Sequence, residues 1–449
     1  MHNWIHRSVS AAAVLACVVS SSHAQSNDFY DRFVVTHDSL QSNANFGRAV
    51  EVDSGIVAVG MMRITNPDEI PGRVFFFNAD SGEFIREITA ENDFNDVFGM
   101  SLSADSGVLA VGARLAKNHL GTETGGVYLY DMKTGLPISK FFPEDGEQYD
   151  FFGNDIALDG DTLVVGAWGV DDGMEYQRGA AYVIDTRTGE QLAKLTASDG
   201  KGFDQFGYYI TIGEGLIAVS AIGTDVQGPG FGSVYLYDAK TFQEIGVLSN
   251  GQAPGFGSSV VIHRGILAIG AHGYRDDIDS RVYLFDTHTL EEIGSLIPDE
   301  QRLDEYFGWR MDAHEGRLAV VAPGNSFDGV GVGSSYIFDL ETQTQIARFL
   351  HAAPEFGDSF GSDIAISDHH VVIGSDEHNI DSRHGSAYLY SIRCRGDFNR
   401  DLRITLEDIN SFLELYALQD PAADLDENGE LDYFDLSVLM NAYKQGCGH

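Results

Sequence analysis

The chain has 449 residues, 43% of them apolar and 11% aromatic, and its 68 acidic and 28 basic residues give a net charge of −40. This length and apolar content can bury a large core, so at least one sizeable folded unit is expected. A surface this negative repels phosphate backbones and anionic lipids, which argues against nucleic acid as a partner and favours calcium.

Residues 1–24 are predicted to be a signal peptide. Arg7 precedes an apolar run at residues 11–20 that is too short to span a bilayer, and a small-x-small cleavage site ends at Ala24. Cleavage there predicts a secreted protein. As an alternative, Cys17 lies in a lipobox-like sequence and would anchor an acylated chain at the cell surface. No later run reaches the length of a membrane helix, so no transmembrane segment is predicted.

A Phe-Gly pair recurs seven times between residues 28 and 393. Each pair precedes four short runs of β-branched and aromatic residues separated by Gly and Asp turns, which predicts a four-stranded antiparallel sheet. Because one such sheet cannot bury both faces alone, seven in succession predict an all-β fold, a seven-bladed β-propeller over residues 28–393. The pairs begin at Phe46, Phe98, Phe152, Phe206, Phe256, Phe307 and Phe360.

The seventh copy ends after its third predicted strand, at residues 387–390. A suitable fourth strand lies at the other end of the chain, where residues 33–36 stand as far ahead of their Phe-Gly pair as residues 193–196 do of theirs. We therefore expect the N-terminal strand to complete the last blade. This closure would remove an open sheet edge that invites aggregation.

The repeated motif resembles a known family. Phe-Gly followed about a dozen residues later by Val-Gly-Ala, as at residues 98–99 and 111–113, is similar to the FG-GAP repeat of integrin α-subunit propellers. The resemblance covers residues 30–393 and implies the propeller fold. Calcium-binding members of that family carry an Asp-x-Asp-x-Asp-Gly loop in the first hairpin of the blade. Here that hairpin is shortened, as at residues 159–161, so no calcium site is expected in the propeller.

Two acidic loops within residues 394–449 predict a small calcium-binding module. The second loop, residues 424–435, has side-chain oxygens at positions 1, 3, 5, 9 and 12 and Gly at position 6, as a tight calcium loop requires. The first, residues 397–408, has Leu402 at position 6, so weaker binding is expected there. With a backbone carbonyl from position 7, the predicted ligands are Asp397, Asn399, Asp401, Arg403, Asp408, Asp424, Asp426, Asn428, Glu430 and Asp435.

Each loop leads into a predicted amphipathic helix, and the two apolar stripes are expected to pack face to face. Cys394 and Cys447 bracket the module and form an even pair outside the signal peptide, which predicts a disulfide in an exported chain. The stripes comprise Ile409, Phe412, Leu413 and Tyr416 in the first helix and Leu436, Leu439, Met440 and Tyr443 in the second.

The two loop-helix halves, each with Asp at position 12, resemble type I dockerins, the modules that attach cellulosomal enzymes to cohesin receptors. The resemblance covers residues 394–449 and implies an attachment module with a cohesin-like or cell-surface partner. It places recognition at loop positions 10 and 11, where the family's Ser/Thr pair is absent. A structural calcium module without a partner is the alternative. The four residues at these positions are Leu406, Glu407, Tyr433 and Phe434.

No nucleophile elbow, zinc-protease motif or phosphate loop is found in the sequence, and no catalytic residue is predicted. The densest polar cluster lies in the seventh copy, where solvated loop residues are favoured over a transition-metal or catalytic site. It comprises His369, His370, Asp376, Glu377, His378, Asp381 and His384.

These observations favour an exported calcium-binding protein whose propeller loops bind an extracellular protein or glycan. The alternative is a carbohydrate-active enzyme, a glycoside hydrolase or lyase that carries a dockerin-like tail. That enzyme would need a pair of carboxylates in one pocket, which the sequence does not single out.

Overall fold

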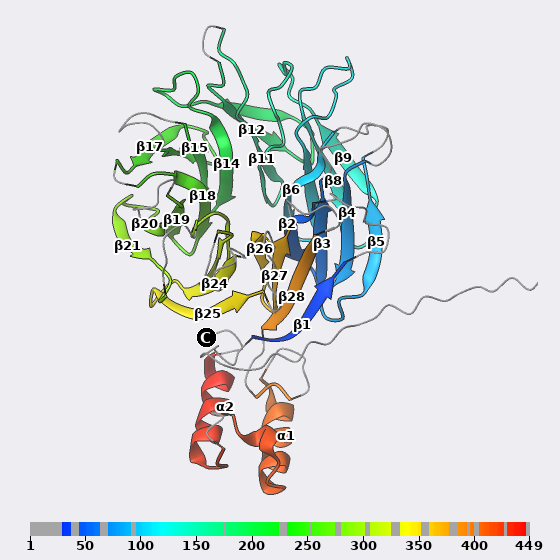
Figure 1. Cartoon of the computed structure of the whole chain (residues 1–449), viewed down its shortest axis with the longest axis vertical. Coiled ribbons are helices and arrows are strands. Elements are labelled where there is room, and N and C mark those ends of the chain that lie inside the picture. Colours follow the sequence, from blue (N-terminus) through cyan, green and yellow to red (C-terminus); the bar gives the residue numbers. More distant parts are fainter. Residues whose placement is uncertain are drawn as a thin grey trace, which may run out of the picture.

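Seven four-stranded antiparallel sheets, the blades, surround a central channel (Figure 1). Among the residues described, no helix is both long and apolar enough to cross a membrane. The computed structural model describes residues 29–36, 45–62, 71–90, 96–173, 176–223, 231–251, 253–273, 280–300, 306–324, 333–351, 359–376, 385–392, 396–398, 404–425 and 429–445.

Within each blade the strands follow one another from the channel outward. The innermost strands of blades 1 to 7 are β2 (Phe46–Asp53), β6 (Phe98–Asp105), β10 (Ile156–Asp159), β14 (Phe206–Gly213), β18 (Phe256–His263), β22 (Met311–His314) and β26 (Phe360–Ile366). The second strands are β3 (Ile56–Met61), β7 (Val108–Ala113), β11 (Thr162–Ala167), β15 (Leu216–Ala221), β19 (Ile266–Ala271), β23 (Arg317–Ala322) and β27 (His370–Ser375).

The two outer layers complete the blades. The third strands are β4 (Arg73–Asn78), β8 (Gly126–Asp131), β12 (Ala180–Asp185), β16 (Ser233–Asp238), β20 (Arg281–Asp286), β24 (Ser334–Asp339) and β28 (Ser386–Ile392). The outermost strands are β5 (Phe84–Ile88), β9 (Pro137–Phe141), β13 (Gln191–Leu195), β17 (Glu244–Ser249), β21 (Glu292–Leu296), β25 (Thr344–Leu350) and, in blade 7, β1 (Phe29–Val35).

The predicted ring closure is confirmed. Strand β1 pairs antiparallel with β28, and Phe33 lies opposite Leu389 in the register. The last blade is therefore built from both ends of the propeller sequence. Its outermost strand, β1, is followed directly along the chain by β2, the innermost strand of blade 1.

The repeated Phe side chains form the centre of the packing between blades. All seven rings are fully buried, and in blade 3 Phe152 meets Tyr182 of the third strand edge to face, with ring centroids 5.3 Å apart. The same contact recurs in blade 4 between Phe206 and Tyr235 at 5.4 Å. Each Phe thus contributes a large buried apolar area and a favourable aromatic geometry.

In five of the seven blades, a glycine near the end of the second strand lies against the glycine of the next Phe-Gly pair. A Cβ on Gly166 of β11 would lie 2.1 Å from the carbonyl oxygen of Gly207, the glycine of the next Phe-Gly pair. Gly207 itself has φ +89°, which side chains rarely adopt. The motif therefore places small residues where two backbones touch. Ser220 and Val321 occupy the position of Gly166 in blades 4 and 6, so the approach is looser there.

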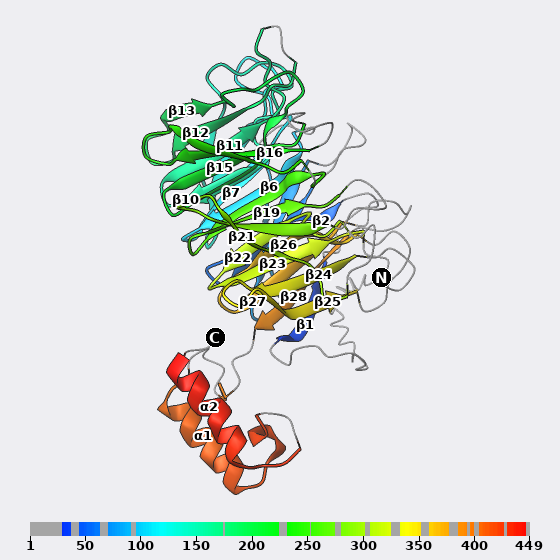
Figure 2. The same cartoon turned by 90° about the vertical axis from the view of Figure 1, so that its left-hand side faces the viewer.

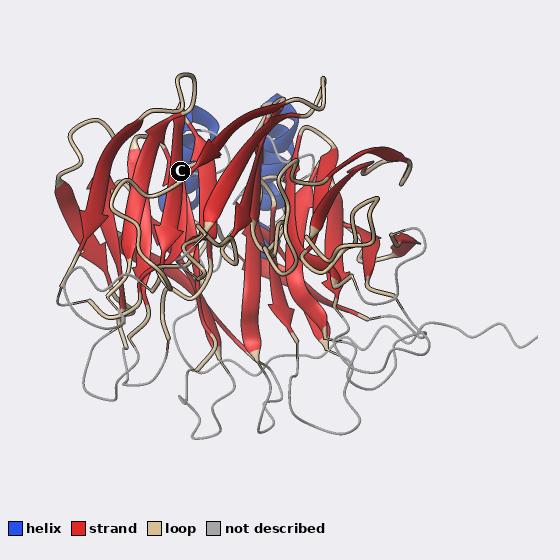
Figure 3. Cartoon of the chain, turned by 90° about the horizontal axis from the view of Figure 1, so that it is seen from above, coloured by secondary structure: helices blue, strands red, loops and turns tan. Residues whose placement is uncertain are grey.

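The C-terminal residues form two helices, α1 (Leu406–Ala417) and α2 (Tyr433–Gln445), with a short 3₁₀ turn, η1 (Pro421–Ala423), between them. Figure 2 shows α1 and α2 side by side, and Figure 3 shows that the propeller itself consists of strands. Phe412 and Leu439 are buried between the helices, as predicted.

Two residues of the predicted stripes are corrected by the structure. Leu413 is 51% exposed and Tyr443 is 43% exposed, so neither belongs to the centre of the helix contact. Ala423 and Leu425, which lie between the helices in sequence, join Phe412 and Leu439 in that core.

Candidate functional site

The channel is lined by the innermost strands of all seven blades and encloses a cavity of about 630 Å³. In five blades the inner strand begins at the Phe of the Phe-Gly pair, and in blades 3 and 6 it begins four residues later; each inner strand ends at the hairpin turn that leads into the second strand. The channel therefore has two mouths with different surroundings. We call the end with the hairpin turns the turn face, and the end with the Phe-Gly pairs and the loops that follow the second strands the loop face.

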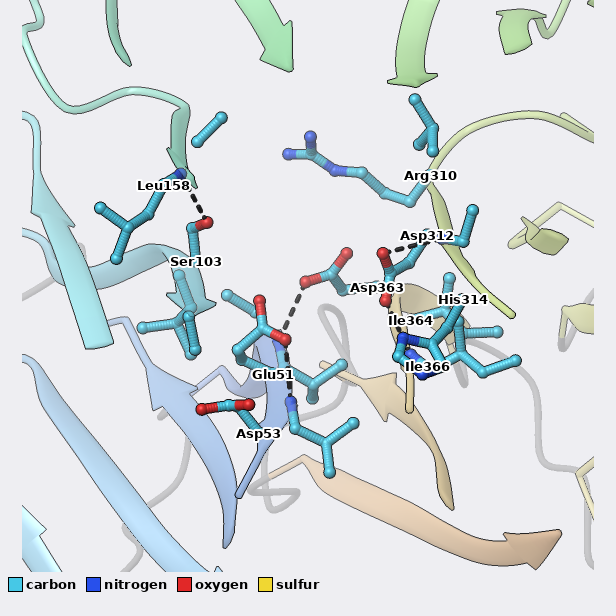
Figure 4. A pocket seen from close by; sticks show the side chains of 18 of the residues that line it. Glu51, Asp53, Ser103, Leu158, Arg310, Asp312, His314, Asp363, Ile364 and Ile366 are labelled. Carbon is cyan, nitrogen blue, oxygen red and sulfur yellow. Dashed lines mark hydrogen bonds between the residues drawn. The ribbon is translucent and has the colours of Figure 1, made fainter. Parts of the chain in front are cut away.

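Among the eight acidic residues that line the channel are Glu51, Asp155, Asp312 and Asp363, and Figure 4 shows Glu51, Asp312 and Asp363 converging there. Burial raises the pKa of Asp155 and of Asp312 to about 6, and it also raises the pKa of Asp363. The pKa of Glu51 lies well above its usual range because the group is desolvated and faces the charge of Asp312. The channel thus holds acids that are reluctant to ionise.

Most of these carboxylates accept hydrogen bonds from the neighbouring blade. The inner strand is a sheet edge, so some of its backbone N–H groups have no partner within their own blade. A side chain three or five positions after the repeated Phe supplies the acceptor. These bonds join Val50 N to Asp363 at 2.9 Å, Ile210 N to Asp155 at 2.8 Å, Ile366 N to Asp312 at 2.7 Å and Leu158 N to Ser103 at 3.0 Å.

Arg310 lies among these acidic residues. The Arg310 guanidinium lies 4.5 Å above the ring of Tyr209, and its Nη1 atom is 3.6 Å from Asp155 Oδ1. The latter distance is longer than a normal hydrogen bond. Donors and acceptors that a polar ligand can bridge therefore lie side by side near the middle of the channel.

On the turn face, side chains of one hairpin accept a hydrogen bond from the glycine N–H of the next. The bonds run from Gly107 N to Asp53 (2.5 Å), Gly160 N to Asp105 (2.7 Å), Gly265 N to Glu214 (2.7 Å) and Gly316 N to His263 (2.9 Å). The polar residues of these turns are thus engaged in joining blades.

The loop face is different, because the residues around its mouth do not repeat. Two positions form this loop-face rim: the residue after each second strand, and the residue after the Phe-Gly pair of the following blade. At four of the seven junctions between blades they meet as an ion pair, a polar pair and two ring pairs. The pairs are Asp376 with Arg48 (3.5 Å), Arg114 with Asn154 (3.4 Å), Trp168 with Tyr208 (5.8 Å between centroids) and His272 with Trp309 (5.0 Å).

Neighbouring loop residues extend the two ring pairs into aromatic clusters. In the first cluster, Phe151 stacks on Trp168 at 4.5 Å and Tyr149 follows at 6.0 Å. In the second, Tyr306 lies 5.9 Å from His272. Burial lowers the pKa of His272 to about 4, so this imidazole is neutral near pH 7.

The structure separates the polar cluster predicted in the seventh repeat. His370 begins β27 at the turn face, where its Nε2 is 3.1 Å from Asp80, while Asp376 follows the other end of β27 at the loop face. Glu377, His378, Asp381 and His384 lie outside the described residues.

One different group of potential metal ligands comes together within the described part of the chain. It consists of His314, Glu315 and Asp368 on the turn face. His314 bonds Asp368 at 2.6 Å, and Glu315 pairs with Arg264, so these contacts also join hairpins.

The two predicted calcium loops share one hydrogen-bond pattern in their described residues. In each, the Asp at position 12 is fully buried and accepts backbone N–H bonds from positions 2 and 9. Asp424, at position 1 of the second loop, accepts the Gly429 N–H at 2.8 Å, while its buried Oδ1 has no hydrogen-bond partner among the described residues. A buried carboxylate oxygen of this kind fits a calcium ligand.

Several predicted residues of the module cannot be placed. Asp397, Asp408, Asp424, Glu430 and Asp435 are described. Asn399, Asp401, Arg403, Asp426, Asn428 and the two cysteines of the predicted disulfide, Cys394 and Cys447, lie outside the described residues, as do residues 1–24.

Comparison with known protein families finds the FG-GAP repeat at residues 137–184, 190–237 and 344–390. No curated protein matches the chain. Each matched segment starts at or next to an outermost strand and runs to the third strand of the following blade. The sequence repeat is therefore offset by one strand from the blade, which explains why the first strand of the chain closes blade 7.

The loop-face rim was missed by sequence reasoning. Its signal lies in the repeats themselves: Arg114, Trp168 and His272 all follow a second strand that ends in Gly-Ala. A position that varies chemically beside positions that repeat is a candidate for function.

Proposed function

We propose that this is an exported recognition protein whose propeller binds an extracellular protein or glycan at the loop face. The observation that carries the proposal is the loop-face rim, where unlike residues replace one another on an otherwise repeating frame. Rigid strands that present varied loops are the usual setting of a binding site. The acids of the turn face and channel wall, in contrast, are largely engaged between blades.

The test is binding of the mature chain to an array that carries both extracellular proteins and glycans. We expect a ligand whose binding is weakened by Arg114→Ala, a rim change, and not by Asp131→Ala, which removes an exposed acid of an outer hairpin. Binding that is equally sensitive to both changes, or no binding at all, would contradict the proposal.

For the C-terminal module we propose calcium binding and attachment to a cohesin-like or cell-surface partner. The orphaned Oδ1 of Asp424 supports the metal, which would be held by loop oxygens and would order the loop against its helix. Exposed apolar side chains at positions 10 and 11 support a docking role: Leu406 is 68%, Tyr433 73% and Phe434 64% exposed.

Calorimetric titration of calcium into the metal-stripped mature protein tests this part. Two equivalents are expected in the unchanged chain, and one or none in the Asp424→Ala/Asp435→Ala variant. Glu414→Gln, an exposed change on α1, serves as the control and should leave the titration unaltered. Several further equivalents would mean that propeller hairpins bind metal.

Export and the Cys394–Cys447 disulfide belong to the same proposal. Mass spectrometry of the secreted protein should give a chain that starts near Gln25 and is two hydrogens lighter before reduction than after it. An acylated Cys17 would instead establish a lipid anchor.

A carbohydrate-active enzyme remains the alternative function, and the raised pKa of Asp155 and Asp312 favours it, because a general acid near neutral pH needs such a value. Their hydrogen bonds to the next blade argue for a structural role. Release of reducing sugar by the mature chain, abolished in Asp312→Asn, would establish the enzyme.

A further inference from the structure

The first aromatic cluster of the loop-face rim is partly open to solvent. Tyr149 is 50% exposed, and Phe151, Trp168 and Tyr208 are half-buried. The four rings make a continuous series from the loop before blade 3 to the inner strand of blade 4. Because each ring packs against the next, the aromatic surface is already formed in the absence of a ligand.

Polar groups are interleaved with these rings. Arg114 lies over the ring of Phe151 at 5.7 Å and reaches Asn154. The indole Nε1 of Trp168 is buried and has no hydrogen-bond partner among the described residues. Because this N–H is enclosed by protein, Trp168 offers a ligand its ring and not its N–H.

The rim leads into the channel, where Arg310, Tyr209 and Asp155 follow. Flat rings stack on the apolar faces of pyranose sugars, while guanidinium, carboxylate and amide groups bond the hydroxyls at the ring edges. Both kinds of group stand next to each other here. A glycan could therefore rest on the rim with one end at the mouth of the channel.

We propose that the loop-face rim, together with the adjoining Tyr149, binds a neutral polysaccharide, with the exposed ring of Tyr149 and the half-buried rings of Trp168 and Tyr208 as the stacking surface. Phe151, which is packed between Trp168 and Arg114, supports these rings from behind. The inference rests on the proposed recognition function and names its ligand class. Charge favours a neutral glycan over an anionic one, because the protein has a net charge of −40. The two rim cations are also engaged already: Arg48 pairs with Asp376, and Arg114 contacts Asn154 and the Phe151 ring.

Affinity electrophoresis of the mature chain in gels containing galactomannan, xyloglucan or mixed-linkage β-glucan tests the proposal, with alginate as the anionic counterpart. Retardation by at least one neutral polymer is expected. Retardation should weaken tenfold or more in Tyr149→Ala/Trp168→Ala. It should weaken less in Tyr149→Ala/Trp168→Phe, which keeps an aromatic ring at position 168. Phe203→Ala removes a 62% exposed ring at the equivalent position of the next blade and should have no effect.

Circular dichroism of each variant separates loss of binding from loss of fold. Retardation by alginate alone, by no neutral polymer, or an equal loss in Phe203→Ala would overturn the inference. If the array reveals a protein ligand at the rim while no neutral glycan binds, the recognition function stands and only this inference fails. If neither a protein nor a glycan binds, the recognition function and this inference are both wrong.

Discussion

The two mouths of the channel are built from the same seven repeats but use their side chains differently. At the turn face, Asp53, Asp105, Glu214 and His263 each bond the glycine of the next hairpin. At the loop face, equivalent positions hold an ion pair in one junction and two tilted aromatic rings in another. The side chains that recur in the turn face join neighbouring blades, whereas the varied side chains of the loop-face rim are available to bind a ligand.

The strongest way to sharpen this contrast is to disturb a repeated backbone contact. Gly166→Ala would put a Cβ 2.1 Å from the carbonyl oxygen of Gly207, so one blade would have to move. We expect a loss of about 3 kcal/mol or more in the free energy of unfolding, measured by urea titration. Gly213→Ala, whose nearest contact would be 3.6 Å, is the control and should cost about 1 kcal/mol or less.

A second, smaller effect concerns the pH dependence of stability. Burial raises the folded-state pKa of Asp155 from 3.8 to about 6, so between these values the folded protein binds more protons than the unfolded chain. This group therefore lowers stability as the pH rises from about 4 to 6, by about 2 to 3 kcal/mol. Asp155→Asn should remove that part of the decline when urea titrations at pH 4.5 and 7 are compared.

Asp131→Asn provides a control of opposite sign. Hydrogen bonds from Thr134 lower the pKa of Asp131, so its contribution is present above the unfolded pKa and is lost as the pH falls through the folded one. A pH profile that Asp155→Asn leaves unchanged would mean that the channel acids are well solvated.

The smallest expected effect lies at the turn face. Asp105→Ala removes the acceptor of the Gly160 N–H, and because the site is exposed the loss should be about 1 kcal/mol or less. Thermal unfolding measures it. A larger loss would mean that the hairpin bonds act together as one ring.

The sequence allowed the blades and their closure to be predicted, because alternating strands and seven Phe-Gly pairs leave few other folds. The rim could not be predicted in this way. Arg114 and Asn154 are 40 residues apart and belong to different blades, so only the stacking of the blades brings them together. The channel carboxylates could not be predicted either, because nothing in the sequence distinguishes them from the rest of the 68 acidic residues.

In the C-terminal module, the positions of the helices and the centre of their contact, Phe412 and Leu439, followed from periodicity, but the edges of that contact did not. Leu413 and Tyr443 fit the stripes and yet are exposed, because Ala423 and Leu425 from the connecting segment occupy the shared core. In so small a module, a few loop residues decide which part of each stripe is covered.

The most direct test of the contrast between the two mouths measures stability and ligand binding in the same pair of variants. Tyr149→Ala/Tyr306→Ala changes exposed rings that adjoin the loop-face rim, and Asp53→Ala/Asp105→Ala changes the turn face. The account predicts that the first variant loses binding to the neutral polysaccharide with a thermal midpoint near that of the unchanged protein, while the second binds normally and melts earlier. Loss of binding in the turn-face variant, with binding intact in the rim variant, would contradict it.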